Sequence, residues 1–498
     1  MVFPDFSSAP KASSGFTLPW DKGNLPKQHW INNEFVASKS SKTIEVYNPK
    51  DGTLVANDVP VAGQDDVDAA VAAAEAAFPK WKKTLPRQRR DLLNKLADLM
   101  VEHQPTLATL TRVTLGMPSG GFGIMEINVA AEAVRYYAGW ADKFPGESHM
   151  QEDGFMKITR HEPLGVVAAI IPFNAPIAVL CHKIGGALIT GNCFIIKPSE
   201  KTPFAALALG QLAKEAGFPP GVIQVLTGDG STGALLASHM RIRGITFTGS
   251  AGTGRKVQEA SAKSNFKHVT LELGGKSPAM IFDDCNLDIA VAWCVNGITM
   301  NSGQACVAAS RVYVQEGIYP KFVEAYTAAL EARAKTVGDP DESSTQLGPI
   351  VDKLQYDRAR EFIERAKAQY KLLTGGVDGY FIPPTAFTDV PEDAEIVKTE
   401  IFGPVAVINT FKTEEEALAK ANDTEYGLFA GVFTQDINKA MRVVAETESG
   451  MVGVNCMSYG SINVPFGGSK QSGVGRENGI DGLRGFTEPK TVFINLNY

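Results

Sequence analysis

Residues 165 to 275 alternate between short apolar runs and longer segments with apolar residues every three or four positions, which constrains the fold more than any other feature. Short apolar runs indicate buried strands, and the longer periodic segments indicate helices. The expected strands are GVVAAIIPF, CFIIKPS, VIQVLTG, GITFTGS and HVTLELGG, separated by the expected helices PIAVLCHKIGGALITG, PFAALALGQLAKEAG, GALLASH and TGRKVQEASAK. Because each helix connects two strands, we expect right-handed crossovers and a parallel sheet covered on both faces.

The chain continues on both sides of this unit. Its 498 residues are too many for one ordinary core, so two or three domains are expected. A second α/β region begins after Gly275 with the helical LDIAVAWCVNGITMN, the strand RVYVQ and the helix YPKFVEAYTAALEARAK. The segments before the alternation are the strand-like HWINNEFV and KTIEVYNP and the helical VDAAVAAAEAAFPKW, RQRRDLLNKLADLMVEHQ and NVAAEAVRYYAGWADKF. The chain ends in the extended KTVFINLNY, and such a strand often pairs with another sheet edge, in some proteins that of a partner subunit.

Charge and cysteine usage argue against several classes of function. The net charge is −7 and no run of five basic residues occurs, which argues against a nucleic-acid or anionic-membrane partner. No stretch approaches 18 consecutive apolar residues, and the first residues, MVFPDFSSAPKASSGF, lack a signal pattern. Six cysteines without a C-x-x-C pair and seven histidines without an H-x-x-x-H pair indicate neither a zinc site nor a disulfide framework. We therefore expect a cytoplasmic protein without a metal.

The turn GDGSTG at residues 228–233 matches the dinucleotide motif G-x-G-x-x-G and lies between an expected strand and an expected helix. The usual acidic companion should fall near residue 252, where GSAGTGRK contains no acid. The motif is therefore more typical of a glycine-rich turn than of a direct pyrophosphate contact. Gly249 and Ser250 in the next turn, FTGSAGTGRK, form the better phosphate cradle because they precede a helix start with basic residues nearby.

The stretch NSGQACVAAS places a single thiol, Cys306, after a turn and between the small residues Ala305 and Val307. A buried cysteine usually acts as a small hydrophobe, so core packing is one interpretation. The alternative is a reactive thiolate, which small neighbours would leave approachable. This stretch alone leaves both interpretations open.

Seven motifs occur in order and in register along the chain. They are PFNAP (172–176), KPSE (197–200), FTGSAGTG (247–254), LELGGKSP (271–278), GQAC (303–306), EIFGPV (400–405) and PFGGSKQSG (465–473). Together they resemble the NAD(P)-dependent aldehyde dehydrogenase superfamily, in its hydrolytic branch, from about residue 30 to the C-terminus. The resemblance implies an α/β fold with a Rossmann-like cofactor domain, an α/β catalytic domain and a small β oligomerisation arm. The expected boundaries are 1–272 for the NAD-binding domain, interrupted by an arm segment at about 140–162, then 273–475 for the catalytic domain and 476–498 for the C-terminal oligomerisation arm.

By this resemblance, Cys306 is the nucleophile, Asn174 an oxyanion donor and Glu272 the general base. Hydride can leave a carbonyl carbon only after attack has made it a tetrahedral alkoxide, and a thiolate is suited to that attack. The side-chain amide of Asn174 and the backbone N–H of Cys306 would hold the alkoxide. Glu272 would activate the water that hydrolyses the resulting thioester. Without the resemblance, Asn174 is a turn residue and Glu272 a strand-end residue at a solvated rim.

The resemblance also implies NAD as the cofactor, with NADP possible but less favoured. Lys197 and Glu200 would contact the adenosine ribose hydroxyls, and the Glu200 carboxylate would repel a 2′-phosphate. Ser250 would bind the pyrophosphate, while Glu400 and Phe402 would hold the nicotinamide ribose and ring. The full set of expected cofactor-binding residues is Lys197, Glu200, Gly249, Ser250, Phe173, Leu273, Glu400 and Phe402.

Approximate register with the family predicts an aldehyde tunnel lined by Val129, Ala175, Val179, His182, Ala305, Val307, Tyr459 and Phe466. Small side chains at positions 129 and 175 predict a wide tunnel, and its rings favour medium or bulky apolar or aromatic aldehydes. No acidic residue marks the tunnel for a cationic substrate. Phe173 stands where tryptophan is frequent in the family, which changes packing rather than chemistry.

Three alternatives to a hydrolytic NAD-dependent dehydrogenase stay open at this point. A catalytically silent relative with a structural or binding role would not need Cys306, Glu272 and Asn174 together. A semialdehyde dehydrogenase that acylates coenzyme A tends to lack the base that Glu272 provides. A Rossmann alcohol dehydrogenase that used GDGSTG would leave the thiol without a function. The expected partners are a small-molecule aldehyde and further copies of the chain, with a homotetramer favoured over a dimer.

Overall fold

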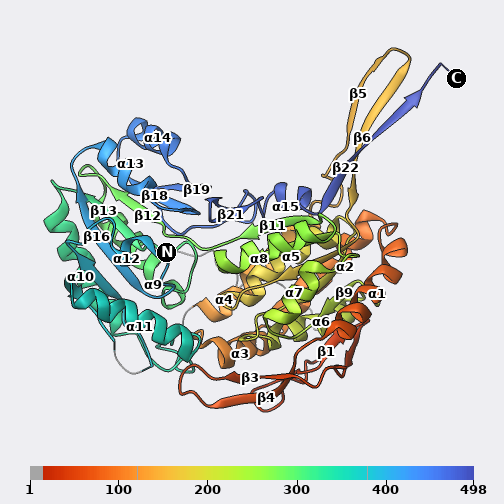
Figure 1. The fold of residues 1–498 in the computed structure, drawn as a ribbon, viewed down its shortest axis with the longest axis horizontal. Coiled ribbons are helices and arrows are strands. Elements are labelled where there is room, and N and C mark those ends of the chain that lie inside the picture. Colours follow the sequence, from red (N-terminus) through yellow and green to blue (C-terminus); the bar gives the residue numbers. More distant parts are fainter. Residues whose placement is uncertain (1–14, 120–121, 378–379, 498) are drawn as a thin grey trace.

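The computed structural model describes residues 15–119, 122–377 and 380–497. Residues 1–14 lie outside the described residues. They include most of MVFPDFSSAPKASSGF, the segment that lacks a signal pattern. Two α/β lobes lie side by side, and a narrow β arm projects from the first of them (Figure 1). None of the helices in the described ranges is both long enough and apolar enough to span a membrane.

The first lobe is built on a mixed sheet of eight strands. In spatial order these are β2 (Glu34–Val36), β1 (His29–Ile31), β9 (Ile223–Val225), β8 (Cys193–Lys197), β7 (Val166–Ile170), β10 (Gly244–Thr248), β11 (His268–Glu272) and β21 (Gly473–Val474). The stretch from β9 to β11 is parallel, and β2, β1 and β21 are added antiparallel at the two edges. Every residue of β7 and β8 is buried because helices cover both faces of the sheet.

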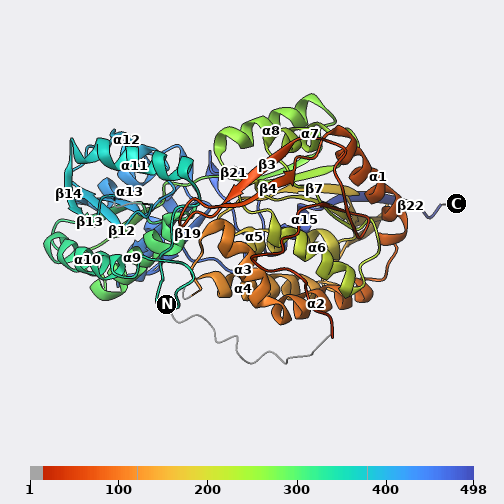
Figure 2. The ribbon, with the colours of Figure 1, turned by 90° about the horizontal axis from the view of Figure 1, so that it is seen from below.

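Figure 2 shows the helices of this lobe on the two sides of its sheet. One side carries α1 (Gln64–Trp81), α7 (Gly230–Ser238) and α8 (Ala251–Lys263); the other carries α2 (Pro86–Glu102), α3 (Gln104–Leu115), α4 (Phe122–Ala138), α5 (Pro176–Ile189) and α6 (Phe204–Ala216). The predicted alternation is confirmed, because β7, α5, β8, α6, β9, α7, β10, α8 and β11 follow one another along the chain as expected.

The order of the parallel strands creates a crevice at one edge of the sheet. From β7 the chain adds β8 and β9 on one side, and it then returns to add β10 and β11 on the other side. The connections after β7 and β10 therefore leave the sheet in opposite directions. In open α/β sheets, such a reversal opens a binding crevice outside the carboxyl ends of the two strands.

The second lobe contains a seven-stranded sheet. Its order is β14 (Lys371–Thr374), β15 (Thr385–Thr388), β16 (Val405–Phe411), β13 (Arg311–Gln315), β12 (Pro278–Ile281), β18 (Phe429–Phe433) and β19 (Met451–Val454). All neighbours are parallel except β14 and β15. The helical segments of this lobe are α9 (Leu287–Thr299), the 3₁₀ turn η1 (Met300–Gly303), α10 (Tyr319–Ala334), α11 (Lys353–Lys367), α12 (Glu395–Lys398), α13 (Glu414–Asn422) and α14 (Ile437–Glu446).

Two short pairs of strands complete the lobes. They are β3 (Thr43–Tyr47) with β4 (Leu54–Pro60), and β17 (Tyr426–Gly427) with β20 (Ser469–Lys470). After β21, the short helix α15 (Asp481–Arg484) packs against α5, so the chain returns to the first lobe before it enters the arm.

The arm is a three-stranded antiparallel sheet. It consists of β5 (Glu147–Glu152), β6 (Phe155–Pro163) and the terminal β22 (Thr487–Asn495), with β6 in the middle. The expected terminal strand therefore pairs with β6 of its own chain, and it leaves its other edge without a partner strand within the described residues. Met150 and Phe493 are largely exposed on this arm, which stands clear of both lobes in Figure 1.

Candidate active site

A cavity of about 660 Å³ lies at the carboxyl ends of the first sheet, where the sheet meets the second lobe. The first lobe lines it with the residues that follow β7, β8, β10 and β11, which are the strands beside the crevice. The second lobe contributes Cys306, Gln355, Arg358, Glu400 and Phe402. Cavities of this size hold small-molecule ligands and cofactors.

The backbone turn before Cys306 places this residue in the lining of the cavity. Asn301, Ser302 and Gly303 all have left-handed φ angles, of 49°, 54° and 73°. Glycine is required at 303, because a Cβ there would lie 2.2 Å from the backbone carbon of Gly403. The turn therefore packs directly on the loop that carries Phe402, and it leaves Cys306 half-buried at the cavity wall.

Hydrogen bonds fix this turn to its surroundings. The Ser302 hydroxyl donates to the carbonyl of Gly348 at 2.7 Å, and the Gln304 side-chain oxygen accepts the backbone N–H of Val351 at 2.9 Å. Gln304 is 1% exposed, so these bonds are shielded from water. A nucleophile held by a rigid turn loses little entropy when it meets its substrate.

Asn174 is bound to the same turn from the opposite lobe. Its side-chain NH₂ donates to the backbone carbonyl of Gln304 at 2.9 Å. The backbone carbonyl of Asn174 accepts a hydrogen bond from the side-chain NH₂ of Asn301 at 2.7 Å. Asn174 also lines the cavity. The structure thus places a neutral amide donor beside the segment that presents the thiol, although the two come from different lobes.

Glu272 ends β11 and lines the cavity with its side chain 3% exposed. Neither carboxyl oxygen has a hydrogen-bond partner among the described residues. Burial, and secondarily the charge of Glu477, raise the pKa of Glu272 well above its usual range, while Lys183 and Arg476 act in the opposite direction. A buried carboxyl without a partner in a cavity is a candidate for proton transfer.

Behind Glu272 lies a polar cluster that the sequence did not reveal. Lys183 of α5 donates to Thr246 of β10 at 2.9 Å and also binds Glu477. The Thr246 hydroxyl in turn donates to Glu477 at 2.7 Å. These residues are far apart along the chain, and no motif connects them, so only the folded structure brings them together.

The Cys306 thiol lies in a negative environment. Burial, followed by the charges of Glu400 and Glu272, raises the pKa of Cys306 to about 12. The resting side chain is therefore a thiol at neutral pH, and a base must take its proton for the sulfur to act as a nucleophile. Glu272, whose charge acts on the thiol and whose oxygens are unpaired, is the group suited to that task.

All eight residues expected to bind a cofactor line the cavity: Lys197, Glu200, Gly249, Ser250, Phe173, Leu273, Glu400 and Phe402. The amine of Lys197, the last residue of β8, lies 3.6 Å from the carboxylate of Glu200, and the Ser250 side chain caps the start of α8. Gly230 and Gly233 of the GDGSTG turn also line the cavity, so both glycine-rich turns face the same space. Their roles in binding stay a prediction.

The eight residues expected in the aldehyde tunnel lie outside the lining of this cavity. His182 faces a separate small hollow together with Lys183, Thr246 and Glu477. Tyr459 is more than half exposed and meets Trp293 edge-on, with ring centroids 6.4 Å apart. Val129 lies on α4 and Val179 on α5, whereas Ala175, Ala305, Val307 and Phe466 lie in loops.

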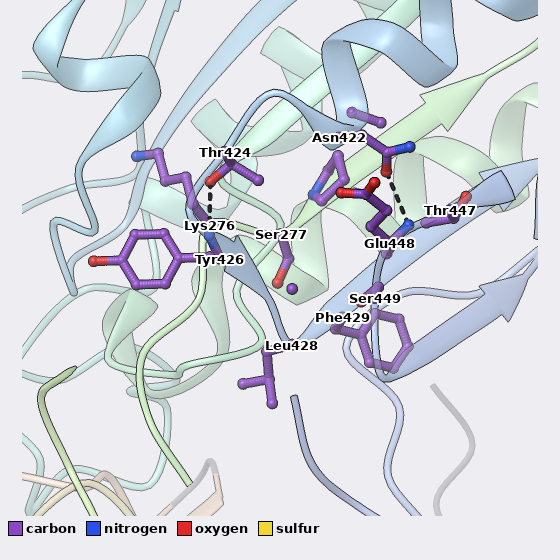
Figure 3. A pocket seen from close by; sticks show the side chains of 14 residues that line it. Lys276, Ser277, Asn422, Thr424, Tyr426, Leu428, Phe429, Thr447, Glu448 and Ser449 are labelled. Carbon is purple, nitrogen blue, oxygen red and sulfur yellow. Dashed lines mark hydrogen bonds between the residues drawn. The ribbon is translucent and has the colours of Figure 1, made fainter. Parts of the chain in front are cut away.

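A second hollow, in the second lobe, has about 10 Å³, enough for one water at most, and its lining does not include Cys306. Figure 3 shows Lys276 and Tyr426 on one side of it and Asn422 and Glu448 on the other. The Lys276 amine has no hydrogen-bond partner among the described residues, and burial lowers its pKa to about 7. Because this hollow is too small for a substrate and lacks Cys306, the cavity of about 660 Å³ is the candidate active site.

Helix α11 supplies two cavity residues that the sequence analysis missed, Gln355 and Arg358. Gln355 donates to the carbonyls of Ile401 and Phe402, and Arg358 donates to the carbonyl of Glu400. The amphipathic stretch KLQYDRAREFIERAK could have predicted the helix, since its apolar residues recur at helical spacing. Its position at the cavity could not be predicted, because that depends on how the lobes meet.

Comparison with known proteins agrees with this geometry. The sequence profile of the Aldehyde dehydrogenase family matches residues 35–492. An aldehyde dehydrogenase of Agaricus bisporus is 44% identical over an alignment of 497 residues that covers 97% of this chain and 99% of that protein. The protein named aldehyde dehydrogenase [NAD(P)+] 2 of Saccharomyces cerevisiae is 45% identical over 94% of this chain and 95% of its own length.

The chain belongs to the aldehyde dehydrogenase family.

Solved structures support the assignment. The indole-3-acetaldehyde dehydrogenase of P. syringae, solved with NAD+, superimposes with a TM-score of 0.92 at 34% identity. The match covers 96% of this chain and 100% of that one. The expected α/β fold of an aldehyde dehydrogenase is thereby confirmed, and the alcohol dehydrogenase alternative is wrong.

Proposed function

We propose that this aldehyde dehydrogenase oxidises an aldehyde to its carboxylic acid with NAD, through a covalent thioester on Cys306. The observation that carries the proposal is that Cys306, Asn174 and Glu272 line one cavity, together with the residues expected to hold the cofactor. The NAD+ complex of the P. syringae indole-3-acetaldehyde dehydrogenase supports NAD as the cofactor. The name of the yeast relative, aldehyde dehydrogenase [NAD(P)+] 2, is consistent with NAD and leaves NADP as a less favoured alternative.

Cys306 attacks the aldehyde carbon as Glu272 accepts the thiol proton. The carbonyl oxygen becomes an alkoxide, which the Asn174 amide and the Cys306 backbone N–H stabilise by hydrogen bonds. NAD, when bound, supplies the acceptor for the hydride that the tetrahedral carbon then releases. Lys197 and Glu200 would bind the adenosine ribose, Ser250 would bind the pyrophosphate, and Glu400 with Phe402 would hold the nicotinamide half.

Glu272 releases the proton of the thiol to solvent, and it then takes a proton from a water molecule that attacks the thioester carbon. Its carboxylate suits this step because burial raises its pKa well above the usual range, which makes it a stronger base. Hydrolysis breaks the carbon–sulfur bond, releases the acid and returns Cys306 as a thiol. A relative that transfers the acyl group to coenzyme A would not need this base.

The pH dependence of turnover should reveal the polar cluster behind Glu272. Only the carboxylate form of Glu272 accepts a proton, so turnover should fall as the pH drops through its raised pKa. Glu477→Gln removes a charge that raises this pKa and leaves Lys183, which lowers it. We therefore expect the acidic limb of the kcat profile to move to lower pH.

Glu259→Gln, on the exposed surface of α8, is the control for this shift, and a thermal melt of each variant separates loss of fold from altered titration. An acidic limb that stays in place, or moves to higher pH, would show that Glu477 does not tune the base.

Cofactor choice should depend on Glu200. Its carboxylate lies 3.6 Å from Lys197 and repels a 2′-phosphate, so Glu200→Ser should raise kcat/KM for NADP relative to NAD, by about tenfold. Initial rates with each cofactor measure the ratio. Glu259→Ser removes an exposed carboxylate of α8 outside the cavity lining and should leave the ratio near that of the unaltered enzyme. A ratio unchanged by Glu200→Ser would contradict the ribose contact.

We further propose a medium or bulky apolar or aromatic aldehyde as the substrate and a homotetramer as the assembly. Retinal dehydrogenases of several vertebrates, 44% identical, support the first proposal, and the open edges of the arm support the second.

NADH formation from aliphatic through aromatic aldehydes, with and without coenzyme A, tests the function. Turnover that requires coenzyme A would replace hydrolysis by acyl transfer, and no turnover with any aldehyde would indicate a silent relative.

A further inference from the structure

One wall of the cavity is closed by side chains from both lobes. The first lobe contributes Lys201, which follows β8, and Phe173, which follows β7. The Lys201 amine lies 2.6 Å from the carboxylate of Asp352 in the second lobe and 4.9 Å from the centre of the Phe173 ring. The Phe173 ring meets Phe402 of the second lobe edge-on, with centroids 5.6 Å apart. An ion pair and an aromatic contact therefore connect the lobes beside the cavity.

The two oxygens of Asp352 have separate roles. Oδ1 accepts the backbone N–H of Gln355 at 2.8 Å and so caps the start of α11, while Oδ2 faces Lys201. One turn further along, Gln355 donates to the carbonyl of Phe402 at 3.1 Å, and Arg358 donates to the carbonyl of Glu400 at 2.7 Å. The beginning of α11 thus connects the Lys201 ion pair to the loop that carries Glu400 and Phe402.

This loop depends on external support. Phe402 has a φ angle of 61°, a left-handed conformation that is unfavourable for a bulky side chain. Its conformation is held by the Gln355 hydrogen bonds to two consecutive carbonyls. Motion of the start of α11 away from the first lobe would therefore displace Phe402 and the edge-on contact with Phe173.

We propose that the ion pair of Lys201 with Asp352 holds the cavity closed over the bound cofactor and slows its release after the reaction. Both residues are positioning residues, since they act through α11 and Phe402 rather than on the reacting atoms. Their side chains are 22% and 30% exposed, so salt and water reach the pair but the surrounding chain partly shields it. This inference rests on the cofactor site proposed above.

Other ion pairs connect the lobes without touching the cavity. Asp341 of the second lobe binds Lys22 at 2.8 Å, Lys50 at 3.0 Å and Arg112 at 2.8 Å. None of these four residues lines the cavity. Lys22→Gln is a matched control for Lys201→Gln, because it also removes a lysine–aspartate ion pair between the lobes, but one away from the cavity.

The test measures the rate at which NADH leaves the full-length enzyme, by stopped-flow fluorescence with an excess of NAD as competitor. Lys201→Gln removes the positive charge, and Asp352→Asn removes the negative charge while it keeps an oxygen to cap α11. We expect each variant to release NADH about two- to fivefold faster, since a partly exposed ion pair contributes at most about that factor.

Three further readouts separate this role from a general loss of stability. Lys201→Arg should restore slow release, and the Lys201→Gln/Asp352→Asn double variant should be no faster than either single variant. Raising the salt concentration should speed release from the unaltered enzyme and not from Lys201→Gln. Lys22→Gln should release NADH at the unaltered rate. Equal release rates for all variants, or additive effects in the double variant, would overturn the proposal.

The experiment also distinguishes the two proposals from each other. Phe402→Ala should weaken NADH binding if the cavity holds the nicotinamide half. If Phe402→Ala and Glu200→Ser both leave NADH affinity unchanged, the proposed cofactor site is wrong. If those two variants weaken binding while Lys201→Gln and Asp352→Asn leave release unchanged, the ion-pair proposal alone is wrong.

Discussion

Cys306→Ala should lower aldehyde-dependent NADH formation by about ten-thousandfold or more, to background. Removal of the sulfur leaves no group that can form the covalent adduct, and loss of a nucleophile has effects of this order in other covalent enzymes. The side chain is half-buried and alanine is only slightly smaller, so the fold should persist. The measurement is NADH absorbance with a saturating aldehyde, beside a thermal melt.

Cys456→Ala is the matched control for this variant, because Cys456 is the other half-buried cysteine in the described residues. We expect the control to keep turnover within about twofold of the unaltered enzyme, as for a surface substitution. Turnover by Cys306→Ala at even a few per cent of the normal rate would remove Cys306 from the nucleophilic role.

Glu272→Gln should form about one NADH per site, in a burst slower than that of the unaltered enzyme because the thiol has lost its base, and should then nearly stop. The amide cannot accept a proton from water, so the thioester should accumulate while hydrolysis slows by about a hundred- to ten-thousandfold. Rapid-mixing absorbance measures the burst, and mass spectrometry of the quenched protein should find the acyl group on Cys306.

Glu259→Gln should show the normal steady rate in the same assay. If Glu272→Gln turns over steadily at the normal rate, another group activates the water. If the burst keeps its normal rate, another group takes the thiol proton, whereas a slowed burst that recovers as the pH rises separates loss of the base for the thiol from loss of the base for hydrolysis.

Local sequence patterns predicted the first lobe well because each of its elements is encoded by a short segment. The buried strands β7 and β8 are continuous apolar runs, and α5 and α6 follow them at helical spacing. Asn174 and Glu272 were expected at the site only because of the family resemblance. In the structure Asn174 follows β7 and Glu272 ends β11, at the edge where the carboxyl ends of the parallel strands meet.

Contacts between the lobes could not be predicted in the same way. The sequence analysis gave the phosphate role to Gly249 and Ser250 over GDGSTG, yet Gly230 and Gly233 line the same cavity. It also passed over α11 entirely, although that helix holds the loop of Phe402. Such placements depend on how two separately folded sheets pack, which no local pattern encodes.

The surroundings of the residues expected in the aldehyde tunnel also depend on contacts between distant parts of the chain. Val179 and His182, both assigned to the tunnel by register with the family, lie one turn apart on α5. The structure instead places His182 in a hollow with Lys183 and Glu477, because the end of the chain folds back against α5 there. Register alone could not reveal that the returning segment occupies this face.

The hydrogen bonds between Asn174 and the turn of residues 301–304 have a consequence for how this enzyme can fail. In the proposed mechanism, the sulfur of Cys306 belongs to one lobe, while the amide donor Asn174 and the base Glu272 belong to the other, so the reaction would need the two lobes in close alignment. Displacing reacting groups by 1 Å can reduce a rate by about a hundredfold. Substitutions at this contact between the lobes should therefore abolish turnover while the protein still folds and keeps its normal melting temperature.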